Sequence, residues 1–139
     1  MCHKFDLRDR LEINPLTLPV TDILATKLQV FQANEKDYRD IVTILVDYDV
    51  DTGIDGVRIA KLCADDWGIY MTFNRTLRDT LSKVDLFELD TPARDTVKSR
   101  IKKLNSMIES MPKSTKWQLR AIVGEKAQWY KLPDDTVGI

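Results

Sequence analysis

The chain has 139 residues, of which 43% are hydrophobic, a formal net charge of −1 and two cysteines. This size and composition predict one folded domain with a buried core, and they exclude a disordered chain and a disulfide-stapled secreted scaffold. The sequence shows no apolar run of transmembrane length and no signal-peptide pattern, so we expect a cytoplasmic protein with no membrane partner.

The first elements in chain order are a strand and a pair of helices. Residues 1–14 alternate apolar and charged side chains, which predicts a strand with a slip in register. Two prolines follow, and residues 20–34 then place Ile23, Leu24, Leu28 and Phe31 on one face of a helix that Thr17 or Thr21 could cap. Asn34 and Asp37 have the spacing of a capping box, which opens a second helix over 35–48. The short connection predicts that the two helices pack antiparallel.

The remaining elements are three more helices and a hairpin. Helices are predicted over 56–66 and 70–84, with Gly68 interrupting between them, and over 90–111, with Asp90 or Thr91 as the cap and Pro92 in the first turn. Residues 113–133 then change period and predict a β-hairpin that turns at 124–126. The expected fold is therefore mainly α (α+β): one domain over 1–139, with a strand at 1–14, a bundle of about five helices within 18–112, and a C-terminal β-hairpin at 113–133.

The residues that usually carry catalysis or bind metal are scarce. His3 is the only histidine and lies beside the terminus, so neither a Ser–His or Cys–His site nor a zinc site is supported. The alternating acids at 47, 49 and 51 match the first ligands of an EF-hand loop, but Thr52 replaces its glycine and Arg58 replaces its closing glutamate. This pattern favours a solvated acidic loop. No glycine-rich phosphate loop is present, and we predict no catalytic and no metal-binding residue in this chain.

Charge is distributed unevenly along the chain. Residues 94–131 hold ten basic and three acidic residues, and the rest holds eleven basic and nineteen acidic residues. The basic part either docks on the acidic part or forms a binding face, and the sequence favours neither. Within the expected hairpin, cations lie among aromatic residues, as in proteins that bind single-stranded RNA, although Trp117 and Trp129 fit core packing better. The candidate RNA-binding residues are Lys116, Arg120, Lys126 and Lys131.

The second candidate site lies in residues 27–40. Lys27 comes late on the first helix and Lys36 opens the second, and a helix N-terminus with nearby cations suits a phosphate group. Asp37 and Asp40 either orient these lysines or cap the helix and favour its dipole. From the residues alone, the capping interpretation is favoured.

The segment "LPVTDILATKLQVFQANEKDYRDIVTILVDYD" resembles the part that follows the catalytic core in AbiEii-type nucleotidyltransferase-like proteins, which belong to the DNA polymerase beta nucleotidyltransferase superfamily. The shared pattern is a helix ending in Lys-Leu (Lys27 and Leu28), followed by Lys-Asp-x-x-Asp (Lys36, Asp37 and Asp40) at the start of the next helix. The opening "MCHKFDLRDRLEINPLTLP" and the tail "MPKSTKWQLRAIVGEKAQWYKLP" resemble the corresponding parts of related predicted nucleotidyltransferases. The resemblance covers nearly the whole chain through short motifs.

The resemblance implies transfer of a nucleotide from an NTP with Mg²⁺. It implies that Lys27 contacts the triphosphate, with Lys36 beside it and with Asp37 and Asp40 in support. However, no Gly-Ser pair occurs in this sequence, and Asp6 and Asp9, the only acids near the corresponding strand, cannot rebuild the missing turn, so two-metal chemistry lacks its ligands. We therefore expect a helical accessory domain that is inactive alone. Its catalytic core, with Mg²⁺ and NTP, would belong to the same or a separate chain.

Two further expectations follow from the sequence. The chain is either a fragment, a split gene product or a degenerate relative, and its early strand could pair with a second copy in a homo-oligomer. The alternative function is a non-enzymatic interaction module that binds protein or RNA through residues 94–131.

Overall fold

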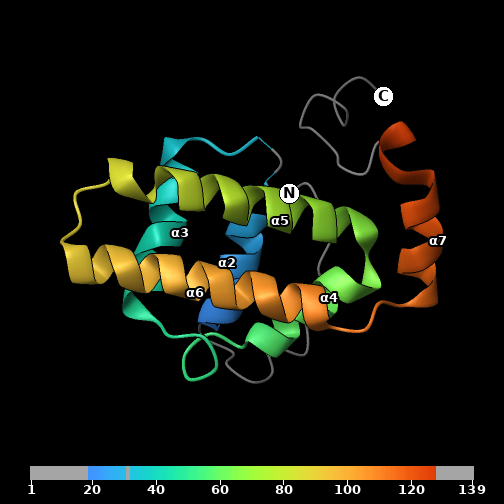
Figure 1. Ribbon diagram of the computed structural model, residues 1–139, viewed down its shortest axis with the longest axis horizontal. Helices are drawn as coiled ribbons and strands as arrows, with labels where there is room; N and C mark the ends of the chain where they lie inside the picture. The colour runs from blue at the N-terminus through green and yellow to red at the C-terminus, as the bar shows by residue number, and fades with distance from the viewer. Residues whose placement is uncertain (1–18, 31, 128–139) are drawn as a thin grey trace.

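The computed structural model describes residues 19–30 and 32–127, and this part of the chain is mainly helical (Figure 1). Among these residues the only β-pairing is an isolated bridge between Val50 and Ile54. The mainly helical class is confirmed, as are helices at the five places expected before residue 112. The elements are α2 (Val20–Leu28), α3 (Glu35–Asp47), α4 (Gly56–Asp65), α5 (Trp67–Lys83), the 3-10 turn η1 (Val84–Leu86), α6 (Thr91–Ser110), α7 (Thr115–Val123) and the 3-10 turn η2 (Gly124–Lys126).

Side-chain caps fix where most of these helices begin. The predicted capping box is confirmed at α3: the Asn34 side chain accepts the backbone N–H of Asp37, and the Asp37 carboxylate accepts the N–H of Asn34, both at 3.0 Å. Asp90 caps α6 as predicted. The predicted break at Gly68 is wrong, because the cap is Asp66 and Gly68 lies in the first turn of α5. Such caps satisfy backbone donors that the first helical turn leaves open.

The helix α2 differs from its prediction in two ways. Its N-cap is Pro19, without a side-chain hydrogen bond, and Thr21 instead accepts the backbone N–H of Asp55 at 2.8 Å. It also ends at Leu28, so the helix does not run to Asn34. Leu24 and Leu28 are fully buried as expected, but Ile23 is 40% exposed because the inward face also contains Thr21 and Ala25.

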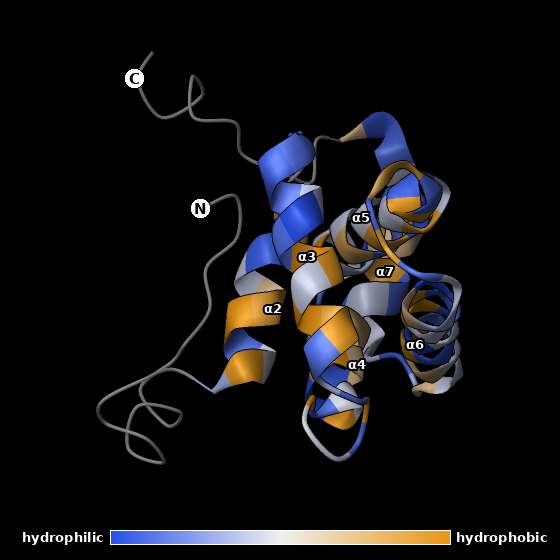
Figure 2. Cartoon of the chain, turned by 90° about the vertical axis from the view of Figure 1, so that its left-hand side faces the viewer, coloured by the Kyte–Doolittle hydropathy of each residue, from blue (hydrophilic) through white to orange (hydrophobic). Residues whose placement is uncertain are grey.

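The core lies between α2, α3, α4, α5 and α6. The predicted stripe of α6 is confirmed, since all four of its apolar residues are fully buried (Val97, Ile101, Leu104 and Ile108). Phe73 and Leu77 of α5 and Ile41 and Leu45 of α3 are buried in the same cluster. Full burial of one such side chain contributes about 2 kcal/mol. Figure 2 shows hydrophobic turns of α2, α3 and α4 within this arrangement.

The first arm of the predicted hairpin is wrong, because residues 115–123 form the helix α7. Ser114 accepts the N–H of Trp117 at 3.1 Å and so caps the helix, and Gly124 ends it with a positive φ of 63°. Trp117 packs edge-on against Tyr70 of α5, with ring centroids 5.2 Å apart. The apolar residues of this segment fit both a strand and a helix period, and the serine cap favours the helix. The second arm from residue 128 and the strand at 1–14 lie outside the described residues.

Candidate functional site

The structure brings Lys27 and Asp40 together. Lys27 stands in the last turn of α2, and its Nζ lies 2.9 Å from Oδ2 of Asp40 on α3. About a third of each side chain is exposed, 31% and 35%. Lys36 is exposed and lies four residues before Asp40 on α3, which places the two on the same face of that helix. Lys27 and Asp40 therefore meet across the α2–α3 pair, and Lys36 lies on the same face of α3 as Asp40.

The fourth predicted residue, Asp37, has a different function. Both its carboxylate and its backbone N–H are engaged with Asn34 in the capping box. Nearby, Arg39 forms an exposed ion pair with Glu35 at 2.8 Å. The capping interpretation is thus confirmed for Asp37, and Asp40 is the acid that contacts a lysine.

The charges at this face are mixed, since Lys27 is paired with Asp40 and Arg39 with Glu35. Lys36 is the cation of this face that no hydrogen bond or ion pair joins to another residue in the described ranges. The Lys27–Asp40 pair is partly exposed, so its own contribution to stability is at most about 1 kcal/mol. A phosphate group that reaches Lys27 must compete with Asp40 for the ammonium protons, and the cost of that competition is correspondingly small.

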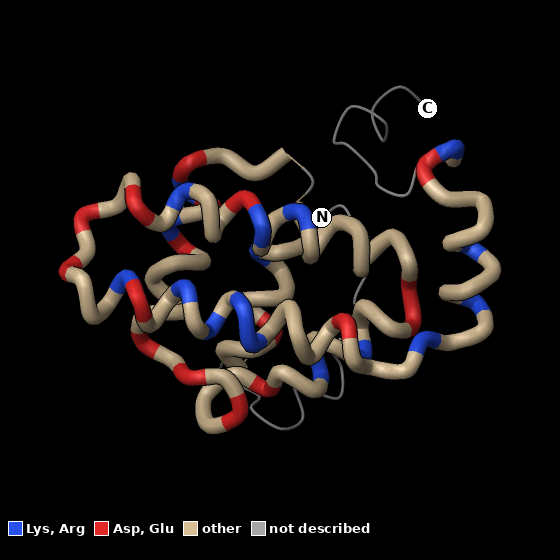
Figure 3. Tube along the Cα trace, in the orientation of Figure 1, with Lys and Arg blue, Asp and Glu red and all other residues tan. Residues whose placement is uncertain are grey.

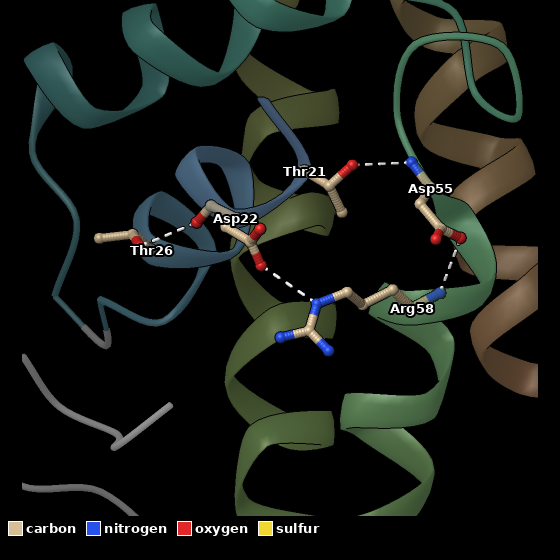
Figure 4. A network of polar contacts seen from close by, with 5 residues as sticks. All are labelled: Thr21, Asp22, Thr26, Asp55 and Arg58. Carbon is tan, nitrogen blue, oxygen red and sulfur yellow. Dashed lines mark hydrogen bonds and ion pairs between the residues drawn. The ribbon is translucent and has the colours of Figure 1, made fainter. Parts of the chain in front are cut away.

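A partly buried ion pair that the sequence did not predict holds α2 in place (Figure 4). Asp22 is 2% exposed, and its Oδ1 accepts a hydrogen bond from Nε of Arg58 on α4 at 3.1 Å. The backbone N–H of Arg58 donates in turn to the Asp55 side chain, and the N–H of Asp55 donates to Thr21. These contacts join α2 to the start of α4 and fix the helix that carries Lys27. The partners lie 36 residues apart, so no local pattern could have revealed them.

The cations of α6 are mostly engaged within the domain. Arg94 and Lys98 both contact Asp85, Arg100 contacts Asp49, and Lys103 contacts Asp51. The hydrogen bond from Lys98 lowers the pKa of Asp85, and the hydrogen bond to Asp51 raises the pKa of Lys103. The interpretation that the basic part docks on acidic residues is therefore confirmed for α6. The same contacts account for two of the three alternating acids, Asp49 and Asp51.

The candidate RNA-binding residues do not form one group. Lys116 and Lys126 are exposed, with no interaction to other described residues. Arg120 is engaged: it donates to the carbonyls of Gly124 and Ala127, and its guanidinium lies over the Trp67 ring at 4.6 Å. Lys131 lies outside the described residues. Only two of these four cations are thus shown to be available for a ligand.

Within the described ranges, no group of three or more His, Cys, Asp or Glu side chains is placed to hold a metal ion. The one cysteine described, Cys63, is fully buried, and burial raises the pKa of its thiol, which disfavours the reactive thiolate. No described helix combines the length and the apolarity needed to cross a bilayer.

Comparison with known proteins gives no match: no protein-family model, no curated protein and no solved structure matches the chain.

Proposed function

We propose that this chain is a helical accessory domain of a nucleotidyltransferase-like protein and that it contributes Lys27 to the phosphate side of an NTP site. The observation that carries the proposal is the ion pair between Lys27 and Asp40. The segment with the family-like pattern forms two packed helices, and the pattern's first lysine and last acid meet across them. A resemblance in short motifs gains weight when its residues converge in space.

Each residue then has a defined function. Lys27 is held by Asp40 and donates to a phosphate oxygen when the ligand binds. Lys36 lies one turn from Asp40 and adds a second donor. Asp37 fixes the start of α3 and acts only through that helix. The acids that hold Mg²⁺ would come from a catalytic core in the same or a separate chain, so this chain alone transfers no nucleotide.

The proposal is tested by titrating the isotope-labelled chain with inorganic triphosphate and recording amide chemical shifts. Two lysines that stand among several carboxylates bind such an anion weakly, with a Kd on the order of millimolar. We expect the largest shifts around residues 27, 36 and 40. Lys27→Ala should abolish most of this response, because it removes the donor held at the centre of the site.

The matched control is Lys61→Ala, which removes an exposed lysine from α4. It should leave the titration unchanged. Equal losses in both variants would mean that triphosphate responds only to net charge, and shifts that avoid residues 27–40 would contradict the proposed site.

The alternative function, an interaction module, is supported by a different observation. The helix α7 exposes Lys116 and, next to it, η2 exposes Lys126. Electrostatic RNA binding through these lysines would weaken steeply as salt is raised. A gel-shift titration with single-stranded RNA at low and moderate salt tests this, and the absence of a shift at low salt would exclude RNA.

A further inference from the structure

The helix α7 is attached to the domain through few side chains. It lies at one end, beside α4 and α5, and basic positions recur along it (Figures 1 and 3). None of its nine residues is buried, whereas every other α-helix of the described chain buries at least four. An isolated helix shorter than about 12 residues is marginal in water, so α7 depends on its contacts with the bundle.

Two side chains on one face of α7 make most of these contacts. Trp117 packs edge-on against Tyr70 with ring centroids 5.2 Å apart, and the Lys113 ammonium lies over the Trp117 ring at 5.8 Å. Arg120, three residues further along, lies over the Trp67 ring at 4.6 Å. The Trp117 Nε1 hydrogen is shielded from water but has no hydrogen-bond partner among the described residues, which costs free energy. Undocking hydrates this group, so the contact that holds α7 also carries a cost.

The connection between α6 and α7, residues 111–114, has the features of a hinge. Its middle is fixed to α6, because Nζ of Lys113 donates to the carbonyl of Ile108 in the last turn of that helix at 2.6 Å. The backbone is extended at the first and last residues of the connection. One backbone hydrogen bond joins its end to α4, from the N–H of Ser114 to the carbonyl of Ala64 at 3.0 Å. The chain can therefore turn between the fixed Lys113 and the start of α7.

The hydrophobic core is formed without α7. The cluster of buried side chains and the partly buried apolar residues packed against it all lie within residues 20–111. Moving α7 away from the bundle therefore leaves the contacts of this cluster intact. Segments with few buried contacts open at a lower free energy than the core, and α7 meets this condition.

We propose that α7 is a strap that undocks from α4 and α5 as one unit, turning at residues 111–114, while the bundle of α2 to α6 stays folded. The docked strap covers the Trp67 ring, which is 7% exposed, and holds Arg120 against it. Undocking exposes that ring and releases the guanidinium from it. The strap carries two cations, and in its docked form it offers Lys116 freely and Arg120 only in part. Undocking thus controls how much positive charge α7 presents to an anionic partner.

The proposal is tested by native-state hydrogen exchange of the full chain, followed by NMR at increasing urea. The Trp117 indole N–H is a direct probe of docking, because burial alone shields it. We expect this proton and the α7 amides to share one protection factor, at least about tenfold below that of the α6 amides. Their exchange should depend little on urea, because undocking exposes far less surface than unfolding of the whole bundle.

Two matched variants each remove one helix cap. Ser114→Ala removes the acceptor of the Trp117 backbone N–H and should lower the protection of α7 and of the indole about fivefold, without moving the urea midpoint of the bundle. Asp90→Ala removes the acceptor of the Ala93 backbone N–H at the start of α6. It should have the reverse effect: the urea midpoint falls, and the opening of α7 is unchanged.

Any of three results overturns the proposal. Equal urea dependence for the α7 and α6 amides would mean that α7 unfolds only with the bundle. Exchange of the α7 amides at the rate of an unstructured peptide would mean that α7 does not dock. An indole that stays protected while the α7 amides exchange would mean that the helix frays in place and does not undock.

Discussion

The helices α6 and α7 look similar in the sequence and differ in the structure. Both lie in the basic region 94–131, and both have apolar residues at helical spacing. The apolar stripe of α6 is fully buried and its cations Arg94, Lys98, Arg100 and Lys103 contact acids of the same domain. No residue of α7 is buried, and its aliphatic residues face outward.

This difference shows that an excess of basic residues in a sequence segment does not by itself make a basic binding surface, because ion pairs within the domain can engage those residues. The excess of cations in 94–131 left a binding face as one of two interpretations, but four of the α6 cations are held by Asp49, Asp51 and Asp85. The exposed lysines that no ion pair engages in this part of the described chain are Lys102, Lys116 and Lys126. The contrast can be sharpened by making the same substitution in both helices.

The largest expected effect comes from a matched pair of leucines. Leu104→Ala in α6 should lower the free energy of unfolding by about 2–5 kcal/mol, because it leaves a cavity at a fully buried position. Leu119→Ala in α7 should change it by less than about 0.5 kcal/mol, since Leu119 is 62% exposed. Urea unfolding followed by circular dichroism measures both. Equal losses would mean that α7 is part of the cooperative core.

A smaller effect is expected from a matched pair of cations. Arg100 donates to the carbonyls of Leu45 and Val46 at 2.8 and 3.0 Å, where α3 ends. Arg100→Met should therefore cost about 1–3 kcal/mol, as is typical of hydrogen bonds from charged groups. Lys116→Met should be close to neutral in the same unfolding experiment. If Lys116→Met were as costly, the basic charge of α7 would be structural too.

The smallest change in stability is expected from Tyr70, the residue of α5 against which Trp117 of α7 packs. Burial and the hydrogen bond to Glu109 raise the pKa of Tyr70 to about 12. Below pH 10 the tyrosine is protonated in both the folded and the unfolded chain. Between about pH 10 and 12 the unfolded chain releases this proton while the folded chain retains it, so stability falls as pH rises.

The test is to compare the wild type with Tyr70→Phe by urea unfolding from pH 9 to pH 12. The variant lacks the titrating group, so its stability should fall less steeply between pH 10 and 12. The tyrosinate absorbance of the folded wild type provides an independent reading of the same pKa. Parallel pH profiles for the two proteins would show that Tyr70 titrates normally.

The sequence predicted local features well and contacts between distant segments poorly. The capping box at Asn34 and the buried stripe of α6 depend on residues within a few positions, and both are confirmed. The first arm of the predicted hairpin was wrong because a short amphipathic segment fits both a strand and a helix period, and the cap that decides between them is the single residue Ser114. The pair Asp22–Arg58 could not be predicted at all, because only the packing of α2 on α4 joins its partners.

For the candidate site, the sequence placed four residues in one segment but did not give the arrangement within it. It placed Lys27, Lys36, Asp37 and Asp40 together without assigning the acids. Because α2 packs on α3, Asp40 forms the ion pair with Lys27. Asp37 instead accepts a hydrogen bond from Asn34 in the capping box. Which acid faces the lysine depends on how the two helices are rotated against each other, and this rotation is set by core residues such as Leu28 and Ile41.

The proposed phosphate site is tested most directly by Asp40→Asn in the triphosphate titration. If Asp40 competes with phosphate for Lys27, the variant should bind triphosphate more tightly, by about threefold for the removal of one nearby partly exposed negative charge. Adding Lys27→Ala to this variant should cancel the gain. Affinity that is unchanged or weaker in Asp40→Asn, or a gain that persists without Lys27, would contradict the assignment of Lys27 as the phosphate-binding residue.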